Sequence, residues 1–171
     1  MSPAGALLIL GGIGVVAYLS TLGKVVDAAK RLRYQLTRIQ IYRLKLDQPI
    51  IFRVWIEFTN LANIDIIIQH VYIDFYLNFG TEANPNLQRI ATLHPDQSII
   101  IPANRSEEIA FDVQVRWVNL AATAAQMFKD KITGGAVNFP TTAIADGEIK
   151  TEGFTIPINY TIPFNSTPIE Q

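Results

Sequence analysis

The sequence predicts a mainly β protein: an antiparallel β-sandwich of seven to eight strands with one late helix, preceded by an N-terminal hydrophobic helix expected to be transmembrane. Two observations carry this prediction. Residues 1–23 contain no charged side chain, whereas residues 38–164 contain successive segments in which apolar and polar residues alternate, without the strand–helix rhythm of a parallel sheet. We therefore expect an anchor helix at 1–23, a basic amphipathic connector at 24–37, the sandwich domain at 38–164 and a polar tail at 165–171.

The hydrophobic leader, residues 1–23, is long enough to cross a bilayer. Its apolar core of about 19 residues would measure roughly 28 Å as a helix, close to the thickness of the hydrocarbon layer. A cleaved signal peptide begins with a basic segment, which is missing here, so we expect a retained anchor rather than cleavage or burial among subunits. The expected anchor residues are Leu7, Leu8, Ile9, Leu10, Ile13, Val15, Val16, Tyr18, Leu19 and Leu22.

A basic flank follows the leader. Lys24, Lys30, Arg31 and Arg33 are opposed only by Asp27, and the positive-inside rule then predicts a single-pass protein whose C-terminal domain lies on the cytoplasmic or interior side. Apolar residues at 25, 28, 29, 32 and 36 have helical spacing, so the connector is predicted to be an amphipathic helix. Its cations either contact lipid headgroups or form a solvated face.

The strands are predicted from period-two patterns. Strand structure is expected from residue 38, with a bulge near Tyr42 where the apolar positions change parity. Residues 50–59 alternate throughout and predict a central strand. Residues 60–63 break the pattern before a further strand at 70–79.

The second half is predicted in the same way. A polar loop at 80–86, short strands at 87–93 and 98–101 and a turn at 102–105 precede a long strand at 109–117, with Trp117 on its apolar side. Asn119 is the expected N-cap of a helix over 120–132, which Gly134 and Gly135 end. Strands at 142–150 and 154–163 complete the domain.

Residues 52–66 resemble the strand, Asn-centred turn and second strand of the late embryogenesis abundant type-two family, also called the water stress and hypersensitive response domain. Residues 71–78, 101–106, 109–115 and 147–158 resemble later family segments in the same order. An Asn-Pro pair usually stands in that family where Asn60 and Leu61 stand here. The resemblance covers about residues 38–163. It implies a fibronectin-like β-sandwich without enzymatic activity, often behind an N-terminal membrane anchor.

Composition offers little for catalysis or nucleic-acid binding. A net charge of −1 gives no general attraction to nucleic acid, and the absence of cysteine removes thiol chemistry and Cys-based zinc sites. His70 and His94 lack metal-binding spacing, and no nucleophile motif surrounds Ser98 or Ser106. We therefore predict no catalytic residues, no metal and no cofactor.

Four aromatic residues are candidates for an interaction face. Trp55, Tyr72, Tyr76 and Trp117 would form a strip on one sheet face, with core packing as the alternative. The predicted function is a non-catalytic, membrane-anchored structural or protein-interaction module, with membrane lipid and protein partners or further copies of itself. The alternatives are a structural subunit of a particle, such as a membrane-containing virion or an envelope complex, and a lipid- or small-ligand-binding domain.

Overall fold

The structure, a computed structural model, describes residues 24, 27–28 and 30–170. Its regular elements are β1 (Leu32–Arg43), β2 (Ile50–Asn60), β3 (Ile66–Asn78), β4 (Leu87–Leu93), β5 (Ile99–Ile101), β6 (Ser106–Val115), the 3₁₀ helix η1 (Trp117–Asn119), α2 (Ala122–Ile132), β7 (Thr142–Thr151) and β8 (Phe154–Asn165). The prediction of a mainly β fold with seven to eight strands and one late helix is thus confirmed. The expected transmembrane helix lies outside the described residues. Within the part that is described, no helix has the length and hydropathy needed to cross a bilayer.

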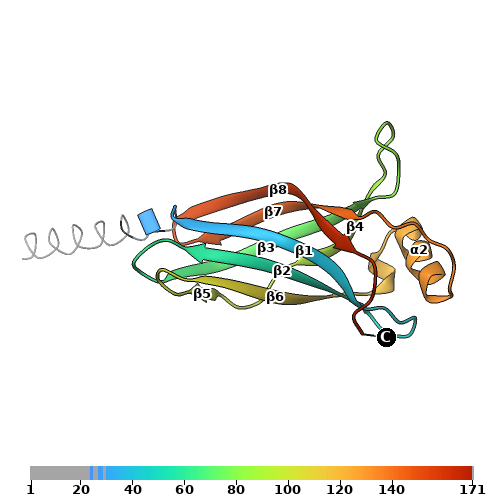
Figure 1. Cartoon of the computed structure of the whole chain (residues 1–171), viewed down its shortest axis with the longest axis horizontal. Helices are drawn as coiled ribbons and strands as arrows, with labels where there is room; N and C mark the ends of the chain where they lie inside the picture. The colour runs from blue at the N-terminus through green and yellow to red at the C-terminus, as the bar shows by residue number, and fades with distance from the viewer. Residues whose placement is uncertain (1–23, 25–26, 29, 171) are drawn as a thin grey trace, which may run out of the picture.

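The strands form one curled sheet in the order β4-β3-β7-β8-β1-β2-β6, with β5 paired to β3 (Figure 1). β1, β2 and β6 make one layer, β3, β4, β5 and β7 make the other, and β8 joins the two. The pairing of β1 with β8 is parallel, at Ile39 with Phe164 and Gln40 with Asn165, whereas a wholly antiparallel sandwich was predicted. The edge strands β4 and β6 do not pair, but residues of both line shared grooves.

β1 begins earlier than the sequence pattern indicated. Residues 32–37, predicted as part of a helical connector, pair with β2 from Leu32 opposite Asn60, so the helical prediction is wrong from Leu32 onward. The physical reason is that Leu32, Tyr34 and Leu36 also satisfy a period of two, and pairing with β2 decides between the two periods. The predicted bulge at Tyr42 is confirmed by the register shift between Ile41 and Arg43.

Two tyrosines join β1 to β8 where the backbones of the two strands do not pair. The Tyr160 hydroxyl accepts a hydrogen bond from Leu36 N at 2.9 Å, and the Tyr34 hydroxyl donates to Pro157 O at 3.1 Å. The two rings are also in contact, with centroids 6.4 Å apart. Along this part of β1 and β8, the tyrosine side chains therefore supply hydrogen bonds in place of backbone pairing between the two strands.

We expect Tyr160 to make the fold sensitive to alkaline pH. Burial raises the pKa of Tyr160 to about 12, although the hydrogen bond from Leu36 N lowers it, while an unfolded tyrosine titrates near 10. The contribution of neutral Tyr160 to the free energy of unfolding is therefore complete below pH of about 10 and is lost as the pH rises toward 12. An ultraviolet phenolate titration of the protein minus that of Tyr160→Phe should have a midpoint near 12. A difference midpoint near 10 would contradict this assignment.

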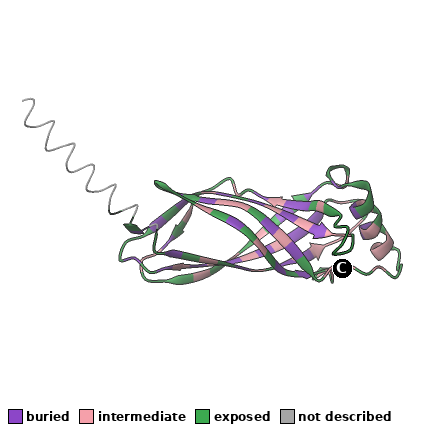
Figure 2. Ribbon diagram, turned by 90° about the horizontal axis from the view of Figure 1, so that it is seen from above, coloured by how far each residue is buried: buried purple, intermediate pink, exposed green. Residues whose placement is uncertain are grey.

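The interior is filled by large side chains, and α2 plugs one end of it. Phe52, Phe58, Phe75 and Phe128 are fully buried, and the Phe128 ring of α2 meets Phe52 edge-on with centroids 5.8 Å apart. Buried and exposed positions alternate along the strands (Figure 2). The layers therefore pack directly on one another around an aromatic core.

The start of α2 differs from the prediction in two ways. Trp117 lies in η1 rather than in the strand, because its indole N–H donates to Lys45 O and Gln48 O, at 3.2 and 2.9 Å. Asn119 is not the cap of α2; the Gln88 side chain of β4 instead accepts a hydrogen bond from Ala124 N at 3.0 Å. A distant side chain has taken the capping role that the local sequence assigned to Asn119.

The end of the chain continues the sheet instead of forming a separate tail. Ile169 N donates to Ile41 O and Glu170 N donates to Tyr42 O, so residues 169–170 lie beside β1. Together with the end of β8 at Asn165, this pairing extends the domain through the predicted polar tail.

Candidate functional site

The most distinctive surface of the domain lies where the described chain begins. We call it the leader-proximal end: residues 24, 27–28 and 30–31, the β2–β3 loop at 61–65, β5, the turn at 102–105 and the β7–β8 turn at 152–153. These segments lie together at the left of Figure 1, opposite the end that α2 covers. The leader, with all the predicted anchor residues from Leu7 to Leu22, lies outside the described residues.

Asn60 organises this end from inside. Its fully buried side-chain amide donates to Ile64 O at 2.9 Å and Ile101 O at 3.0 Å, and its Oδ1 accepts from Ala62 N at 2.8 Å. These bonds direct Ala62 into the core and leave Leu61 and Ile64 outside. The Asn-centred turn is therefore a built element, held by one polar side chain in an apolar surrounding.

Neighbouring backbone bonds fasten the same loop on two sides. Asn104, whose φ is 54°, donates its N–H to Ala62 O at 3.0 Å, and Ala103 N donates to the Asp65 carboxylate at 2.9 Å. On the other side Leu61 N donates to Arg31 O at 3.3 Å. The loop is thus tied both to the turn before β6 and to the segment that precedes β1.

Exposed apolar side chains gather at this end. Ile67 and Ile100 are paired across β3 and β5, and Ile100 is 58% exposed. Leu61 in the loop is 54% exposed. We define the apolar rim as Leu61, Ile64, Ile67, Ile100 and Phe154. Single exposed apolar residues are common on proteins, but several from four segments at one end indicate a contact surface.

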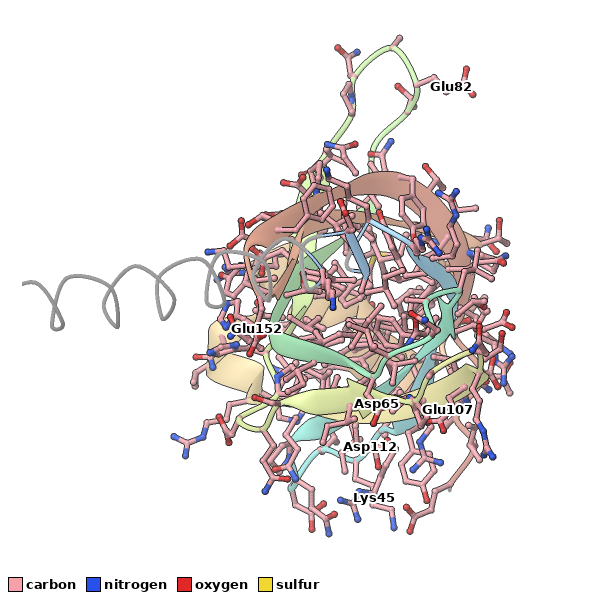
Figure 3. The ribbon with its side chains drawn as sticks, turned by 90° about the vertical axis from the view of Figure 1, so that its left-hand side faces the viewer. Lys45, Asp65, Glu82, Glu107, Asp112 and Glu152 are labelled. Atoms are coloured by element: carbon pink, nitrogen blue, oxygen red, sulfur yellow. The ribbon has the colours of Figure 1, made fainter. Side chains whose placement is uncertain are left out.

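The predicted basic flank lies at the same end. Lys24, Lys30, Arg31 and Arg33 are all exposed, and Lys30 pairs with Asp27 at 3.8 Å. Acidic groups are interspersed, as Figure 3 shows for Asp65 and Glu152. The apolar rim, rather than a strong positive charge, therefore distinguishes this surface.

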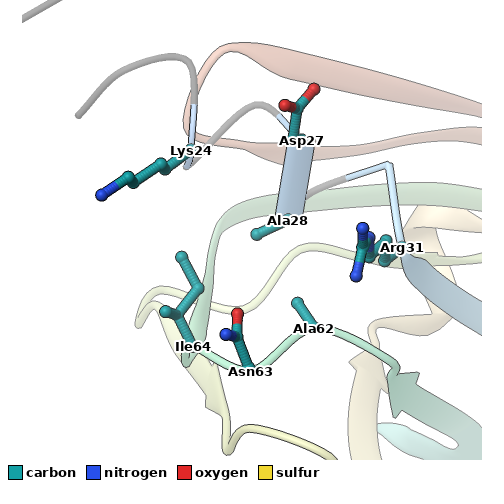
Figure 4. Close-up of a pocket in the computed structure, with 7 residues that line it drawn as sticks. All are labelled: Lys24, Asp27, Ala28, Arg31, Ala62, Asn63 and Ile64. Atoms are coloured by element: carbon teal, nitrogen blue, oxygen red, sulfur yellow. The ribbon is translucent and has the colours of Figure 1, made fainter. Parts of the chain in front are cut away.

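A shallow hollow of about 410 Å³ separates the first described residues from the β2–β3 loop (Figure 4). It is lined by Lys24, Asp27, Ala28, Arg31, Ala62, Asn63 and Ile64. Ala28 is buried, and Arg31 N donates to Ala28 O at 2.9 Å. The segment before β1 is therefore seated on the domain and brings its cations to the edge of the apolar rim.

The four predicted aromatic residues do not share one face. Trp55 lies on the outer side of β2 with Arg38 4.1 Å above its ring, whereas Tyr72 and Tyr76 lie on the outer side of β3 in the other layer. Trp117 is in η1 near the α2 end. The strip predicted from alternation is wrong because the curl of the sheet separates β2 from β3.

The structure brings together two histidines that their sequence positions kept apart. The rings of His70 in β3 and His94 after β4 lie 4.6 Å apart, and Tyr72 contacts both. His94 Nδ1 lies 3.3 Å from Val71 O. Among the described residues, no His, Asp or Glu completes a group of three that could hold a metal ion. His70, Tyr72 and His94 form a packed aromatic cluster.

Asp112 and Asp74 make contacts between neighbouring strands. Asp112 accepts two hydrogen bonds from Arg53, at 2.6 and 2.7 Å, and the Arg53 guanidinium stacks 3.8 Å from the Tyr42 ring. The hydrogen bond with Asp112 raises the pKa of Arg53. Asp74 accepts a hydrogen bond from Thr92 and lies 3.6 Å from Arg89. These groups join neighbouring strands on the outer faces.

The described chain is thus a mainly β domain with a sandwich-like, curled sheet and one helix. No protein-family profile and no curated protein matches the sequence. Solved structures do match.

A protein from Archaeoglobus fulgidus is 7% identical, with 77% of this chain and 94% of the other covered and a TM-score of 0.41. A protein from Bordetella pertussis provisionally classed as ApaA is 11% identical, with 78% and 93% covered and a TM-score of 0.38. A third, a protein provisionally classed as late embryogenesis abundant, is 12% identical, with 90% and 87% covered and a TM-score of 0.39.

Proposed function

We propose that this chain is a non-catalytic module held at a membrane by residues 1–23, with a structural or protein-interaction role. The observation that carries the proposal is the meeting of three features at one end of the domain. The uncharged leader joins the chain there, the basic flank is exposed there, and so is the apolar rim. A hydrophobic segment followed by cations is typical of a domain that is held in position at a membrane.

The fold that accompanies this role is a fibronectin-like sandwich of the late embryogenesis abundant type-two kind. Support comes from the motif order in residues 52–158 and from the buried hydrogen bonds of Asn60, which give the Asn-centred turn a structural purpose. The filled interior around Phe52 and Phe75 favours a structural or interaction role over a ligand held between the layers. Protein partners, or further copies of the chain, would then use the outer faces, with the domain on the cytoplasmic or interior side.

Deleting residues 1–23 should release the domain from membranes. We expect the full chain to sediment with membranes after alkaline carbonate washing, and the truncated chain to stay in the supernatant. Val15→Arg tests the same point with a single substitution. It should also move the chain to the supernatant, since one arginine at the centre of a spanning helix disfavours insertion by about 2.5–3.5 kcal/mol. Val118→Arg, placed on η1, should leave sedimentation unchanged.

Two results would count against the anchor. One is membrane sedimentation that survives the deletion. The other is a purified full-length chain that is a soluble monomer without detergent. The second result would also count against a role as a particle subunit.

A further inference from the structure

We propose that the apolar rim is a bilayer-facing surface: Leu61, Ile64, Ile67, Ile100 and Phe154 enter the interfacial layer of the membrane in which the leader is anchored. This inference rests on the proposed function and deepens it. Anchoring alone requires only that residues 1–23 hold the chain. The inference adds that the folded domain itself stands on the lipid surface with one defined end.

The first argument is the short distance between the leader and the domain. β1 begins at Leu32, and Ala28 before it is already buried against the domain. From Leu22 to Ala28 a helical chain would rise only about 9 Å. The polar layer on each side of a bilayer is about 5–8 Å thick. A domain tethered so closely has its leader-proximal end at the headgroups.

The second argument is the rigidity of what that end presents. Leu61 and Ile64 are held outward by the buried bonds of Asn60, and Ile67 and Ile100 by the pairing of β3 with β5. Apolar groups fixed in an outward position need little further ordering when they enter a lipid interface. The rim is therefore preformed for contact.

The third argument is charge. Lys24, Lys30 and Arg31 border the rim and suit headgroup phosphates, but Asp27, Asp65 and Glu152 offset them. We therefore assign the contact to the apolar side chains. The surface should accept zwitterionic as well as anionic lipid, unlike a polybasic patch, which requires anionic lipid.

The opposite end offers a matched comparison. Val118 is 86% exposed on η1, more exposed than any member of the rim, yet η1 directly precedes α2, and α2 covers the opposite end from the point where the leader joins. If exposure alone decided lipid contact, Val118 would be the first residue to enter the membrane. If attachment through the leader decides which residues meet lipid, Val118 stays in water.

The experiment uses the absence of native cysteine, which allows one fluorophore to be placed at one site. Full-length Ile64→Cys, Ile100→Cys and Val118→Cys chains are labelled with an environment-sensitive dye and reconstituted in vesicles of phosphatidylcholine, with or without phosphatidylserine. Lipids carrying a quencher near the acyl carbonyl then report contact. We expect a blue shift and loss of fluorescence at positions 64 and 100 in both compositions, and neither change at 118.

Three outcomes would overturn the inference. If the labels at 64 and 100 show no more blue shift or quenching than the label at 118, the leader-proximal end stays in water. Labels shielded from aqueous iodide but insensitive to the lipid quencher show a protein contact instead. Quenching only with phosphatidylserine shows a contact made by charge. A chain that does not enter vesicles at all contradicts the anchor itself, and so separates failure of the proposed function from failure of this inference.

Discussion

Replacing Asn60 with alanine is expected to lower the free energy of unfolding by about 3 kcal/mol, because buried backbone groups lose their partners. The amide of Asn60 satisfies Ile64 O, Ile101 O and Ala62 N, and none of its own surface is exposed. Alanine leaves those groups without a bond and opens a small void. Urea denaturation of the full chain in a non-ionic detergent measures the difference.

Two further variants make this result specific. Asn63→Ala changes an exposed residue of the same loop and should stay within about 0.5 kcal/mol of the unmodified chain. Asn60→Asp keeps an acceptor for Ala62 N but faces two carbonyl oxygens with a carboxylate, so it should destabilise at least as much as alanine. If Asn60→Ala proved as mild as Asn63→Ala, the buried network would have no role in stability.

Gly147→Ala is expected to destabilise the domain by about 3 kcal/mol, at the upper end of the range for overpacking. Gly147 lies in β7 opposite Ile73 of β3. A Cβ atom there would lie 2.0 Å from Tyr72 O and 2.8 Å from Ile73 Cα, and these are backbone atoms that no rotamer change can move. The two strands would have to separate at the centre of their pairing. The same urea measurement tests this, together with hydrogen exchange of the β3 and β7 amides.

Gly134→Ala is the comparison for this substitution. Gly134 follows α2 with φ of 82°, and a Cβ atom there meets nothing within 4 Å. Its substitution therefore adds only left-handed backbone strain, about 1 kcal/mol. An equal loss of stability in the two variants would mean that close strand approach at Gly147 does not matter.

These two residues also show where sequence reasoning stops. The break at Asn60 was predicted from the loss of alternation, but its purpose depends on Ile101, which lies 41 positions away. The sequence does not show why residue 147 must be glycine, because only the approach of β3 makes a side chain impossible there. Both effects arise from contacts between segments that a local pattern does not record.

The candidate site divides in the same way. The leader and its basic flank were recognised from charge alone, and the structure places Lys24, Lys30 and Arg31 together at one end. The apolar rim was missed, since Ile67 lies before the strand predicted at 70–79 and its pairing with Ile100 of β5 is a tertiary contact. The aromatic strip failed because alternation tells which side of a strand a residue takes, but not which layer of the curled sheet the strand joins.

Short-range chemistry therefore determined the number and order of the strands, the late helix, the bulge at Tyr42 and the uncharged leader. Periodicity and charge are properties of neighbouring residues, so one sequence is enough to detect them. Tertiary structure alone decided the parallel seam of β1 with β8, the capping of α2 by Gln88, and the rim around the leader-proximal end. Each of these depends on which distant segments meet, and that choice is made by the burial of the whole core.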